Sequence, residues 1–565
     1  MHLRPFVRLQ DHAAHYTPRD HALWRFLMTA LTQSLGQQAH PVYLEGLART
    51  GISLQRIPSI DDMNACLSKI GWRAVVVDGF IPPAIFMEFQ ALKVLVIALD
   101  MRSVEHLFYT PAPDILHESA GHAPFLIDVD YAEFLQRFGE IGMLAIANQH
   151  DHQLYKAIRE LSILKEDVQA PQSAVADAES HLQQLALKAG PPSEAAMLTR
   201  LHWWTVEYGL VGEIDDYRLF GAGLLSSFGE SESCRDDAVV QKIPLTVNAV
   251  NTGYDITSAQ PQLFVTRSCK HMSQVLEEFA ASMAFRRGGA EGLRRAIDAS
   301  VICTAEYDSG VQVSAVLAEQ LCDAVGNVTY LKTAGPTQLA WRGTELYGHG
   351  TGAHAQGFSA PVGLLKDFSR CLSHYTVDEL KAHRICVGEK ATLEFLSGIT
   401  VRGRLEHILR QEQRNLLLSF SDCTVTDLAG RVLFEPAWGR YDMTVGGCIS
   451  RVFGGVADRE RFQLYKPAPR TPTIPTPEDV TLMSGYQELS ALETAGVSAD
   501  PALIQVLHGC FDAYPQEWLL RVEALRAGSG CLPDALLARA RGELDTLVSD
   551  AQHRKALHLV LPTEF

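Results

Sequence analysis

The sequence predicts a mainly α (α+β) first domain, then a small β-rich domain and a helical tail. Three observations lead to this prediction. Amphipathic runs such as DYAEFLQRFGEIGMLAIAN recur up to about residue 305. Short β-branched runs punctuated by glycine, such as ATLEFLSGITVRGRLEHI, follow them. A proline-rich stretch then precedes the last residues, and 565 residues exceed what one hydrophobic core usually supports, so we expect several domains.

The first domain, residues 1–305, is expected to begin with a helix. Thr17 stands before Pro18 and an acidic residue follows in the presumed first turn, a pattern typical of helix N-termini. Within this domain, residues 152–196 are polar and rich in alanine, which indicates exposed helices that Pro171 interrupts. We interpret residues 152–196 as an insertion.

The β-rich domain, residues 306–465, has no role that its residues define, and regulation or self-association is our hypothesis for it. His349 and His354 lie there in a polar, glycine-rich stretch, for which we favour a turn-rich edge or a domain interface over a ligand site. Residues 466–479 contain five prolines in fourteen positions and should form an extended linker. Residues 480–565 are expected to be a helical tail.

The composition bounds the class of protein. A hydrophobic fraction of 47% and a charged fraction of 20% are typical of globular proteins. The formal net charge of -17 argues against a general nucleic-acid binder, which needs a cationic surface. The eleven cysteines include no CxxC pair, and no apolar run approaches the length of a membrane span. We therefore expect a cytoplasmic protein that has neither nucleic acid nor a membrane as a partner.

The densest polar group in the first domain contains two imidazoles around a carboxylate. His117 and His122 flank Glu118 in an apolar neighbourhood, and imidazole is the commonest metal ligand. Five positions turn the second side chain roughly 140° from the first on an ideal α-helix. Convergence on one ion would therefore require a bulge or a helix end, which Gly121 and Pro124 are suited to provide.

A third ligand is available in the run LHWWTVEYGL, whose only acidic group is Glu207. Two imidazoles and one carboxylate form the facial triad that holds iron(II) and leaves positions open. Zinc hydrolases use the same ligand types. A hydrogen-bonded core histidine and an ion-paired glutamate would also explain these residues, so their types alone do not decide between the alternatives.

Three segments, YTPAPDILHESAGHAPF, HWWTVEYGL and FGAGLLSSFGE, resemble in their order the signature segments of the pterin-dependent aromatic amino acid hydroxylases. The resemblance extends over residues 10–290 and is strongest to bacterial catalytic domains of the phenylalanine 4-monooxygenase type. It implies that family's catalytic fold. It also implies that His117, His122 and Glu207 are the iron ligands and the catalytic centre, and that Phe86 and Glu118 bind the pterin.

The resemblance further implies a pocket for a free amino acid. Arg102 matches the arginine that pairs with the substrate carboxylate, and Trp203 the ring that stacks on the substrate. Ile256 matches a position that is apolar in phenylalanine hydroxylases. The family's other positions around the substrate ring fall on Thr110, Pro113, Gly223 and Ser226. His202 departs from the family, which usually has at this position a tyrosine that orders the iron site.

The activity that the resemblance implies is ring hydroxylation of a free aromatic L-amino acid. Iron(II) and a tetrahydropterin, tetrahydrobiopterin or a related one, would be the cofactors, and O2 the co-substrate. Phenylalanine is the preferred substrate, with tyrosine or tryptophan as alternatives. Expected partners are the amino acid, the pterin, pterin-recycling enzymes and a possible second copy of the chain. A zinc hydrolase with Glu118 as general base and a non-catalytic amino acid sensor are the rival hypotheses.

Overall fold

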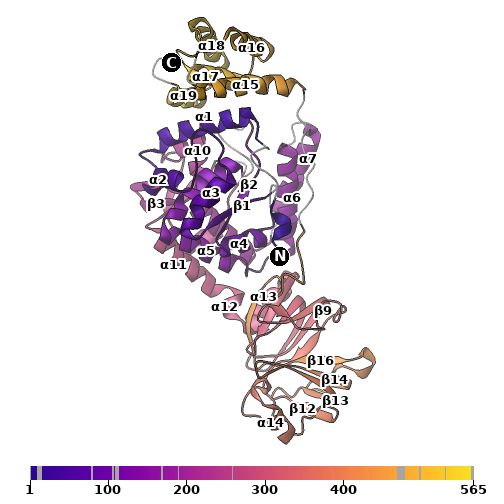
Figure 1. Cartoon of the computed structure of the whole chain (residues 1–565). Coiled ribbons are helices and arrows are strands. Elements are labelled where there is room, and N and C mark those ends of the chain that lie inside the picture. The colour runs from indigo at the N-terminus through magenta and orange to yellow at the C-terminus, as the bar shows by residue number, and fades with distance from the viewer. Residues whose placement is uncertain are drawn as a thin grey trace. The chain divides into compact units, whose positions relative to one another are not determined.

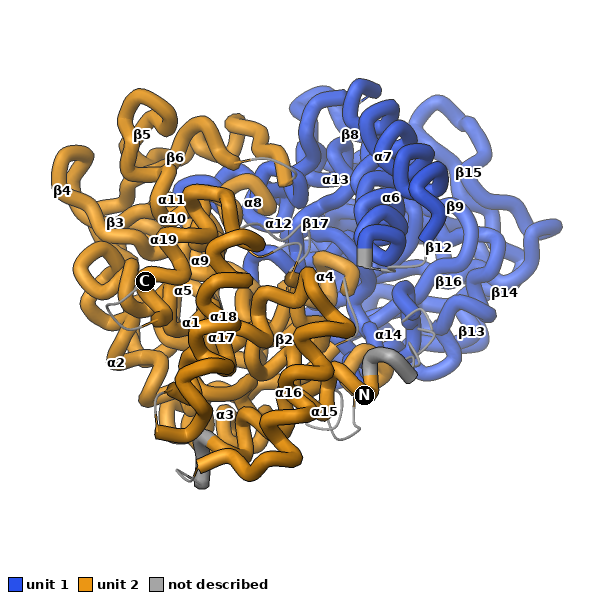
Figure 2. The backbone as a smooth tube through the Cα atoms, turned by 90° about the horizontal axis from the view of Figure 1, so that it is seen from above, with its two compact units in different colours: residues 1–4, 140–198, 276–466 blue, residues 5–139, 199–275, 467–565 orange. Residues whose placement is uncertain are grey.

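The structure is a computed structural model of the chain, and it describes residues 2–8, 16–77, 81–104, 107, 114–166, 170–188, 190–256, 259–466, 477–495, 498–528 and 530–561. It divides into two compact units, shown in Figure 2. Unit 1 comprises residues 1–4, 140–198 and 276–466, and unit 2 comprises residues 5–139, 199–275 and 467–565. Each unit is therefore assembled from segments that are far apart in the sequence.

The described residues up to 300 form helices and a few short strands (Figure 1). Its α-helices are α1 (Pro18–Leu35), α2 (Val42–Arg49), α3 (Ile60–Leu67), α4 (Pro83–Ala91), α5 (Val129–Gly142), α6 (Gln149–Glu166), α7 (Gln172–Leu187), α8 (Glu194–His202), α9 (Ala222–Leu225), α10 (Phe228–Ser233), α11 (Cys269–Ser282), α12 (Ala284–Arg287) and α13 (Gly289–Ala299). The strands are β1 (Arg73–Val77), β2 (Val94–Ala98), β3 (Leu210–Glu213), β4 (Asp216–Leu219), β5 (Gln241–Pro244) and β6 (Gln262–Thr266). The expectation that helices dominate residues 1–305 stays a prediction.

Helix α1 begins where the sequence predicts. The Thr17 hydroxyl accepts a hydrogen bond from the Asp20 amide, and the Asp20 carboxylate accepts one from the Thr17 amide, which together form a capping box. Pro18 occupies the first turn, where its missing N–H has no intrahelical partner to lose. The apolar stripe of the helix, including Trp24 and Leu31, is buried.

Two short sheets lie among these helices. Strands β1 and β2 pair in parallel, with Val75 opposite Val96. Strands β4, β3, β6 and β5 form the second sheet in that order, in which β3 is antiparallel to β4 and parallel to β6.

Helices α6 and α7 stand on either side of Pro171 and pack against each other. That residues 152–196 are an insertion stays a prediction.

Residues 302–454, all of which the structure describes, form the β-rich region that the sequence predicts. One sheet has the order β10, β9, β8, β7, β17, with β11 also paired to β9, and the other has the order β12, β13, β14, β15, with β16 paired to β14. The strands are β7 (Ile302–Tyr307), β8 (Val311–Cys322), β9 (Val328–Trp341), β10 (Thr344–Glu345), β11 (Ser359–Pro361), β12 (Lys390–Glu394), β13 (Thr400–Gln411), β14 (Arg414–Thr426), β15 (Val432–Phe434), β16 (Tyr441–Thr444) and β17 (Ile449–Gly454), and α14 is Val377–Ala382. Val313, Leu339 and Leu417 belong to the continuous buried core of this region.

The predicted helical tail is confirmed by α15 (Pro477–Ala495), α16 (Pro501–Ala513), α17 (Trp518–Ala527), α18 (Asp534–Leu547) and α19 (Ala551–Val560). Helices α15, α17 and α19 pack against α1 within unit 2 (Figure 1). Arg25 of α1 forms a buried ion pair with Glu523 of α17, and Phe26 meets Trp518 edge to face at 5.1 Å. Most of the predicted linker, residues 467–476, lies outside the described residues.

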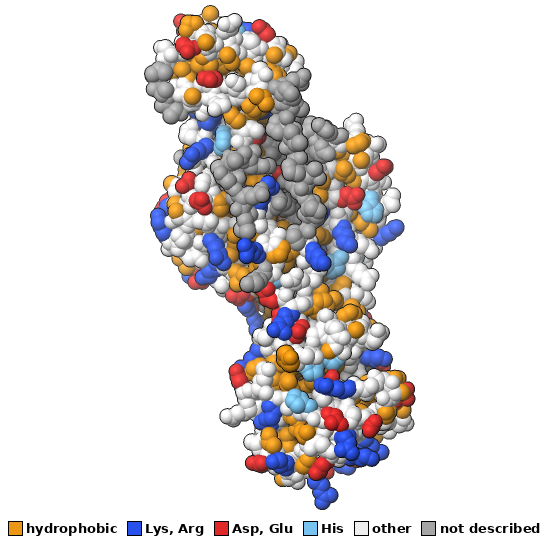
Figure 3. All heavy atoms as spheres, turned by 45° about the vertical axis from the view of Figure 1, so that its right-hand side comes forward, with side chains coloured by type: hydrophobic (Ala, Val, Ile, Leu, Met, Phe, Trp, Pro, Cys, Tyr) orange, Lys and Arg blue, Asp and Glu red, His pale blue; other side chains and the backbone are white. Residues whose placement is uncertain are grey.

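The surface carries charges of both signs. On the face shown in Figure 3, basic and acidic side chains are interspersed over the described residues. None of the helices that the structure describes combines the length and the apolar character that a membrane-crossing helix needs.

Candidate metal centre and active site

Two segments of π-helix bring the predicted metal ligands together in unit 2. The segment Leu116–His122 contains both histidines, and the segment Trp203–Glu207 ends at the glutamate. A π-helix forms its hydrogen bonds between positions five apart, so side chains at that spacing share a face. The irregular helix that the spacing of His117 and His122 requires is therefore present. Helix α9 packs against both π-helical segments.

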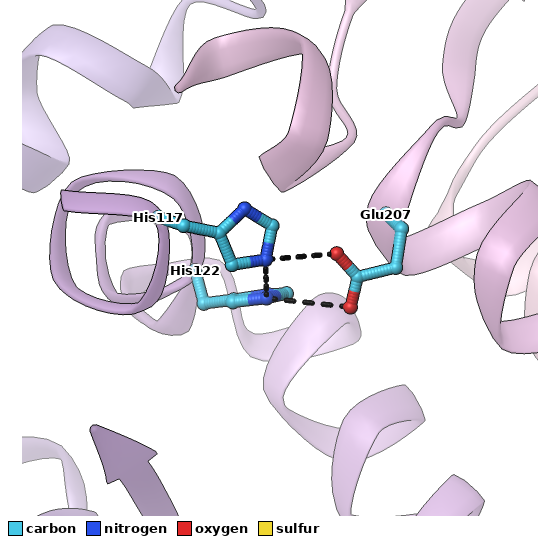
Figure 4. Close-up of side chains that lie close together, drawn as sticks. All are labelled: His117, His122 and Glu207. Carbon is cyan, nitrogen blue, oxygen red and sulfur yellow. Dashed lines mark hydrogen bonds and ion pairs between the residues drawn. The ribbon is translucent and has the colours of Figure 1, made fainter. Parts of the chain in front are cut away.

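The three ligand atoms converge, as Figure 4 shows. Nε2 of His117 lies 3.2 Å from Nε2 of His122 and 3.0 Å from Oε2 of Glu207. Nε2 of His122 lies 3.4 Å from Oε1 of Glu207. Ligand atoms at about 2.0–2.2 Å from one ion are separated by roughly 3.0–3.4 Å. This group of side chains therefore fits a single divalent metal ion.

The hydroxyl of Ser226 orients the ring of His117. The Ser226 hydroxyl lies 3.0 Å from Nδ1 of His117 and donates a hydrogen bond to the Ala222 carbonyl at 2.8 Å. Its oxygen therefore accepts from the Nδ1–H of His117, and Nε2, on the other side of the ring, faces Glu207. Ser226 was predicted to lie around the substrate ring, and the structure places it directly behind a ligand.

Burial and the two imidazoles set the charge of the acidic groups. Burial alone would raise the pKa of Glu207, but the positive field of His122 and His117 and their hydrogen bonds hold it well below its usual value. For Glu118 burial prevails over the attraction of His122 and raises the pKa to about 8. Glu207 is therefore a carboxylate at neutral pH, and Glu118, whose Oε2 lies 3.9 Å from His122, is largely protonated.

His202, which departs from the family pattern, lies against the metal centre. Its Nδ1 is 3.5 Å from Oε1 of Glu207, and its ring meets Phe138 and Phe86 edge to face at 5.0 and 5.9 Å. Burial lowers the pKa of His202 to about 4, so the ring is neutral at physiological pH. Phe86 is thus one side chain removed from Glu207, and its role in pterin binding stays a prediction.

Arg102 is buried and held by an aspartate that the sequence reasoning missed. Its Nε and Nη2 donate to the two carboxylate oxygens of Asp114 at 2.7 and 2.9 Å, and its Nη1 donates to the Ser226 carbonyl at 2.9 Å. Asp114 also accepts from the amide of His117 at 3.0 Å, as an acidic residue at the start of a helix does. Its position three residues before His117 was the signal that could have identified it.

The structure describes only some of the residues that were predicted to surround the substrate ring. Trp203 stacks on Tyr254 at 4.3 Å and on Tyr208 at 4.6 Å, and its Nε1 has no acceptor among the described residues. A Cβ on Gly223 would lie 2.7 Å from the Tyr208 ring, so this glycine makes room for that tyrosine. Thr110 and Pro113 lie outside the described residues. Contact of these residues with a substrate stays a prediction.

Two imidazoles and a carboxylate that converge from π-helical segments define a non-haem metal centre with open coordination positions. The sequence model of one family, described as biopterin-dependent aromatic amino acid hydroxylase, matches residues 11–168 and 172–287. The phenylalanine-4-hydroxylase of Chromobacterium violaceum is 30% identical over 259 residues, which are 46% of this chain and 72% of that protein. The chain belongs to the biopterin-dependent aromatic amino acid hydroxylase family.

Further relatives carry the same name. The phenylalanine-4-hydroxylase of Pseudomonas aeruginosa is 29% identical over 265 residues, covering 47% of this chain and 84% of that protein. A crystal structure of the Chromobacterium violaceum enzyme with bound iron(III) and oxidised 7,8-dihydrobiopterin matches with 28% identity and a TM-score of 0.39, covering 49% of this chain and 85% of that one. These similarities cover about half of the chain.

Proposed function

We propose that the chain is a tetrahydropterin- and iron(II)-dependent monooxygenase that hydroxylates the ring of free L-phenylalanine to give tyrosine. The observation that supports this most directly is the convergence of His117, His122 and Glu207 within the segment that the family model matches. The relatives named above are phenylalanine-4-hydroxylases, which favours phenylalanine over tyrosine and tryptophan. Apolar Ile256 agrees with this choice.

In this proposal His117, His122 and Glu207 hold iron(II). When bound together, iron(II) and the tetrahydropterin supply the activation of O2. Glu118, a buried carboxyl group beside the metal ligands, would form a hydrogen bond with the pterin, and Phe86 would pack against the pterin ring. Both residues are within reach of this task because Glu118 neighbours His122 and Phe86 neighbours His202.

The amino acid would bind beside this centre. The Arg102 guanidinium, oriented by Asp114, would attract the α-carboxylate, and Trp203 would border the aromatic ring. Thr110, Pro113, Gly223 and Ser226 complete the proposed pocket. The ligand side chains are only 5–13% exposed, so a bound substrate would exclude water from the metal with little further closure.

The experiment is incubation of the purified chain with iron(II), tetrahydrobiopterin, O2 and either phenylalanine, tyrosine or tryptophan. Tyrosine formed from phenylalanine, identified by mass and ring position, is the expected product. Glu207→Ala should abolish product formation, because only two protein ligands remain. An active protein that contains zinc and shows no pterin-dependent O2 consumption would indicate a hydrolase. Binding of the amino acid without any hydroxylated product would indicate a sensor. Either result would overturn the proposal.

The remaining assignments extend this proposal. Residues 1–305 would form the catalytic domain, with residues 152–196 as an insertion and residues 466–479 as a linker. Residues 306–465 would serve regulation or self-association, so a homo-oligomer is proposed. We also propose a cytoplasmic location, where enzymes that recycle the pterin would be partners. Size-exclusion chromatography coupled to light scattering tests the oligomer directly.

A further inference from the structure

A second group of potential metal ligands lies in the β-rich region, far from the hydroxylase centre in the sequence. His349 and His354 belong to the loop between β10 and β11, and Asp442 belongs to β16. Nδ1 of His349 is 3.1 Å from Nε2 of His354 and 3.9 Å from Oδ2 of Asp442. The three ligand atoms all lie within 4.8 Å of one another, and both histidines are buried. They form a second arrangement of two imidazoles and one carboxylate.

The geometry of this second cluster resembles that of the first. The two histidines are again five positions apart, and their facing nitrogens are separated by 3.1 Å, against 3.2 Å between His117 and His122. Both separations fall in the range of roughly 3.0–3.4 Å expected of two ligands on one ion. The His349 to Asp442 distance of 3.9 Å is too long for a hydrogen bond, whereas an ion between the two groups would be in reach of both.

The backbone fixes both histidines independently of their side chains. The Leu339 amide donates to the His349 carbonyl at 2.9 Å, and the Thr337 amide donates to the His354 carbonyl at 3.1 Å. Leu339 and Thr337 both belong to β9, so the loop is held at two points along one strand. The ligands therefore lie on a rigid support, which lowers the entropic cost of binding an ion.

Asp442 is oriented in the way that metal-binding carboxylates usually are. Its Oδ1 accepts hydrogen bonds from the hydroxyl of Ser419, directly opposite on β14, and from Nε of Arg440 at 2.9 Å. These two donors leave Oδ2 directed at His349. Partners that hold the second oxygen of a ligating carboxylate typically tune metal affinity.

We propose that His349, His354 and Asp442 bind a divalent transition metal ion of the zinc type, which ties together the two sheets of the β-rich region. The loop belongs to the sheet that contains β9, and Asp442 belongs to the sheet that contains β14, so the ion would cross-link them. Three protein ligands leave one coordination position for water or a small ligand. This inference does not depend on the hydroxylase assignment.

The test uses the full chain with the first centre disabled by His117→Ala and Glu207→Ala. This variant is stripped with a chelator and dialysed against zinc, and bound zinc is counted by atomic emission. We expect about one ion per chain, and about two in the unmodified chain. Adding His354→Gln should remove the remaining ion. Zinc should also raise the unfolding temperature of the double variant and leave that of the triple variant unchanged.

Two controls separate metal binding from folding defects. His374→Gln, an exposed histidine of the same region, should leave zinc uptake of the double variant unchanged. Asp442→Asn keeps the size of the side chain and should weaken zinc binding at least about 10-fold while circular dichroism stays unchanged. Cobalt in place of zinc should give visible absorption bands in the double variant that Asp442→Asn alters. A folded double variant that takes up no zinc, or a folded His354→Gln variant that keeps the ion, would overturn the proposal.

Discussion

Gly121 lies so close to Ala222 that a Cβ on Gly121 would be 2.8 Å from the Ala222 Cβ and 3.0 Å from its carbonyl oxygen. Gly121 stands in the π-helix immediately before His122, and Ala222 opens the helix α9 that packs on it. The contact fixes how the π-helix sits against α9, and with it the direction of the His122 ring.

Gly121→Ala should therefore displace the π-helix and cost about 1–3 kcal/mol of stability, because backbone and not a flexible side chain must give way. Iron affinity should fall with it, measured by anaerobic titration. Gly190→Ala is the matched control, since nothing lies within 4 Å of a Cβ at that exposed position. Equal iron affinity in the two variants would contradict the assignment.

Ser226→Ala should weaken metal binding about 10–100-fold, because Nδ1–H of His117 loses the acceptor that keeps Nε2 free for the ion. The measurement is iron(II) affinity alongside the free energy of unfolding. Ser231→Ala removes another buried hydroxyl, which donates to the Phe228 carbonyl and touches no ligand. Ser231→Ala should lower stability without changing affinity, and a similar loss of affinity in both would show that Ser226 acts only through packing.

The raised pKa of Glu230 should make the free energy of unfolding depend on pH. Burial raises its pKa to about 7 despite the hydrogen bond that it accepts from the Tyr208 hydroxyl. In the unfolded chain the group ionises near its ordinary value, so between that value and about 7 the folded state binds more protons. The stabilisation that protonated Glu230 gives the folded state is therefore lost, and the free energy of unfolding falls, as the pH rises from the ordinary pKa to about 7.

Glu230→Gln should remove this contribution. The free energy of unfolding of Glu230→Gln relative to the unmodified chain should rise from about pH 4.5 to pH 7 and then level off. Urea titrations at several pH values measure the difference directly. Parallel curves for the two proteins would show that Glu230 ionises normally in the folded state.

Glu523→Ala should destabilise unit 2 by about 3 kcal/mol, because it leaves the buried guanidinium of Arg25 without its carboxylate partner. Hydrogen exchange should accelerate in α15–α19 before it does in the strands of the β-rich region. Glu488→Ala, at an exposed position of α15, is the control and should change neither quantity. Unaltered exchange in Glu523→Ala would show that the ion pair does not hold these helices to α1.

The metal centre could be predicted from the sequence because its ligands lie in two short motifs. The spacing of His117 and His122 even indicated an irregular helix, and the structure has a π-helix there. Arg102 was predicted to face the substrate, but the sequence does not show that Asp114, twelve positions later, engages two of its nitrogens, because such a pairing depends on the tertiary structure. The stacking of Trp203 on Tyr254, 51 positions later, is equally non-local.

The second cluster shows where such reasoning ends. His349 and His354 were interpreted as part of a turn-rich edge or a domain interface, because a polar, glycine-rich stretch explains them without a ligand. Asp442 follows His354 by 88 positions and reaches it only through the pairing of β16 with β14 and the contact of β16 with β11. Sheet register and the packing of two sheets are tertiary properties, which hydrophobic patterns in one chain do not encode locally.

The pairing of α1 with α17 has a consequence for biosynthesis. Arg25 and Glu523 are 498 residues apart, so at about 5–20 residues per second a ribosome makes α17 roughly 25–100 s after α1. During that interval the nascent chain displays Phe26 without Trp518 and Arg25 without its carboxylate, while the strands of the β-rich region emerge between them. The contacts between α1 and α17 in unit 2 therefore form late in translation. If a ribosome stalls while it makes the strands of the β-rich region, α1 of the hydroxylase segment still exposes its α17-binding side chains, to which chaperones can bind.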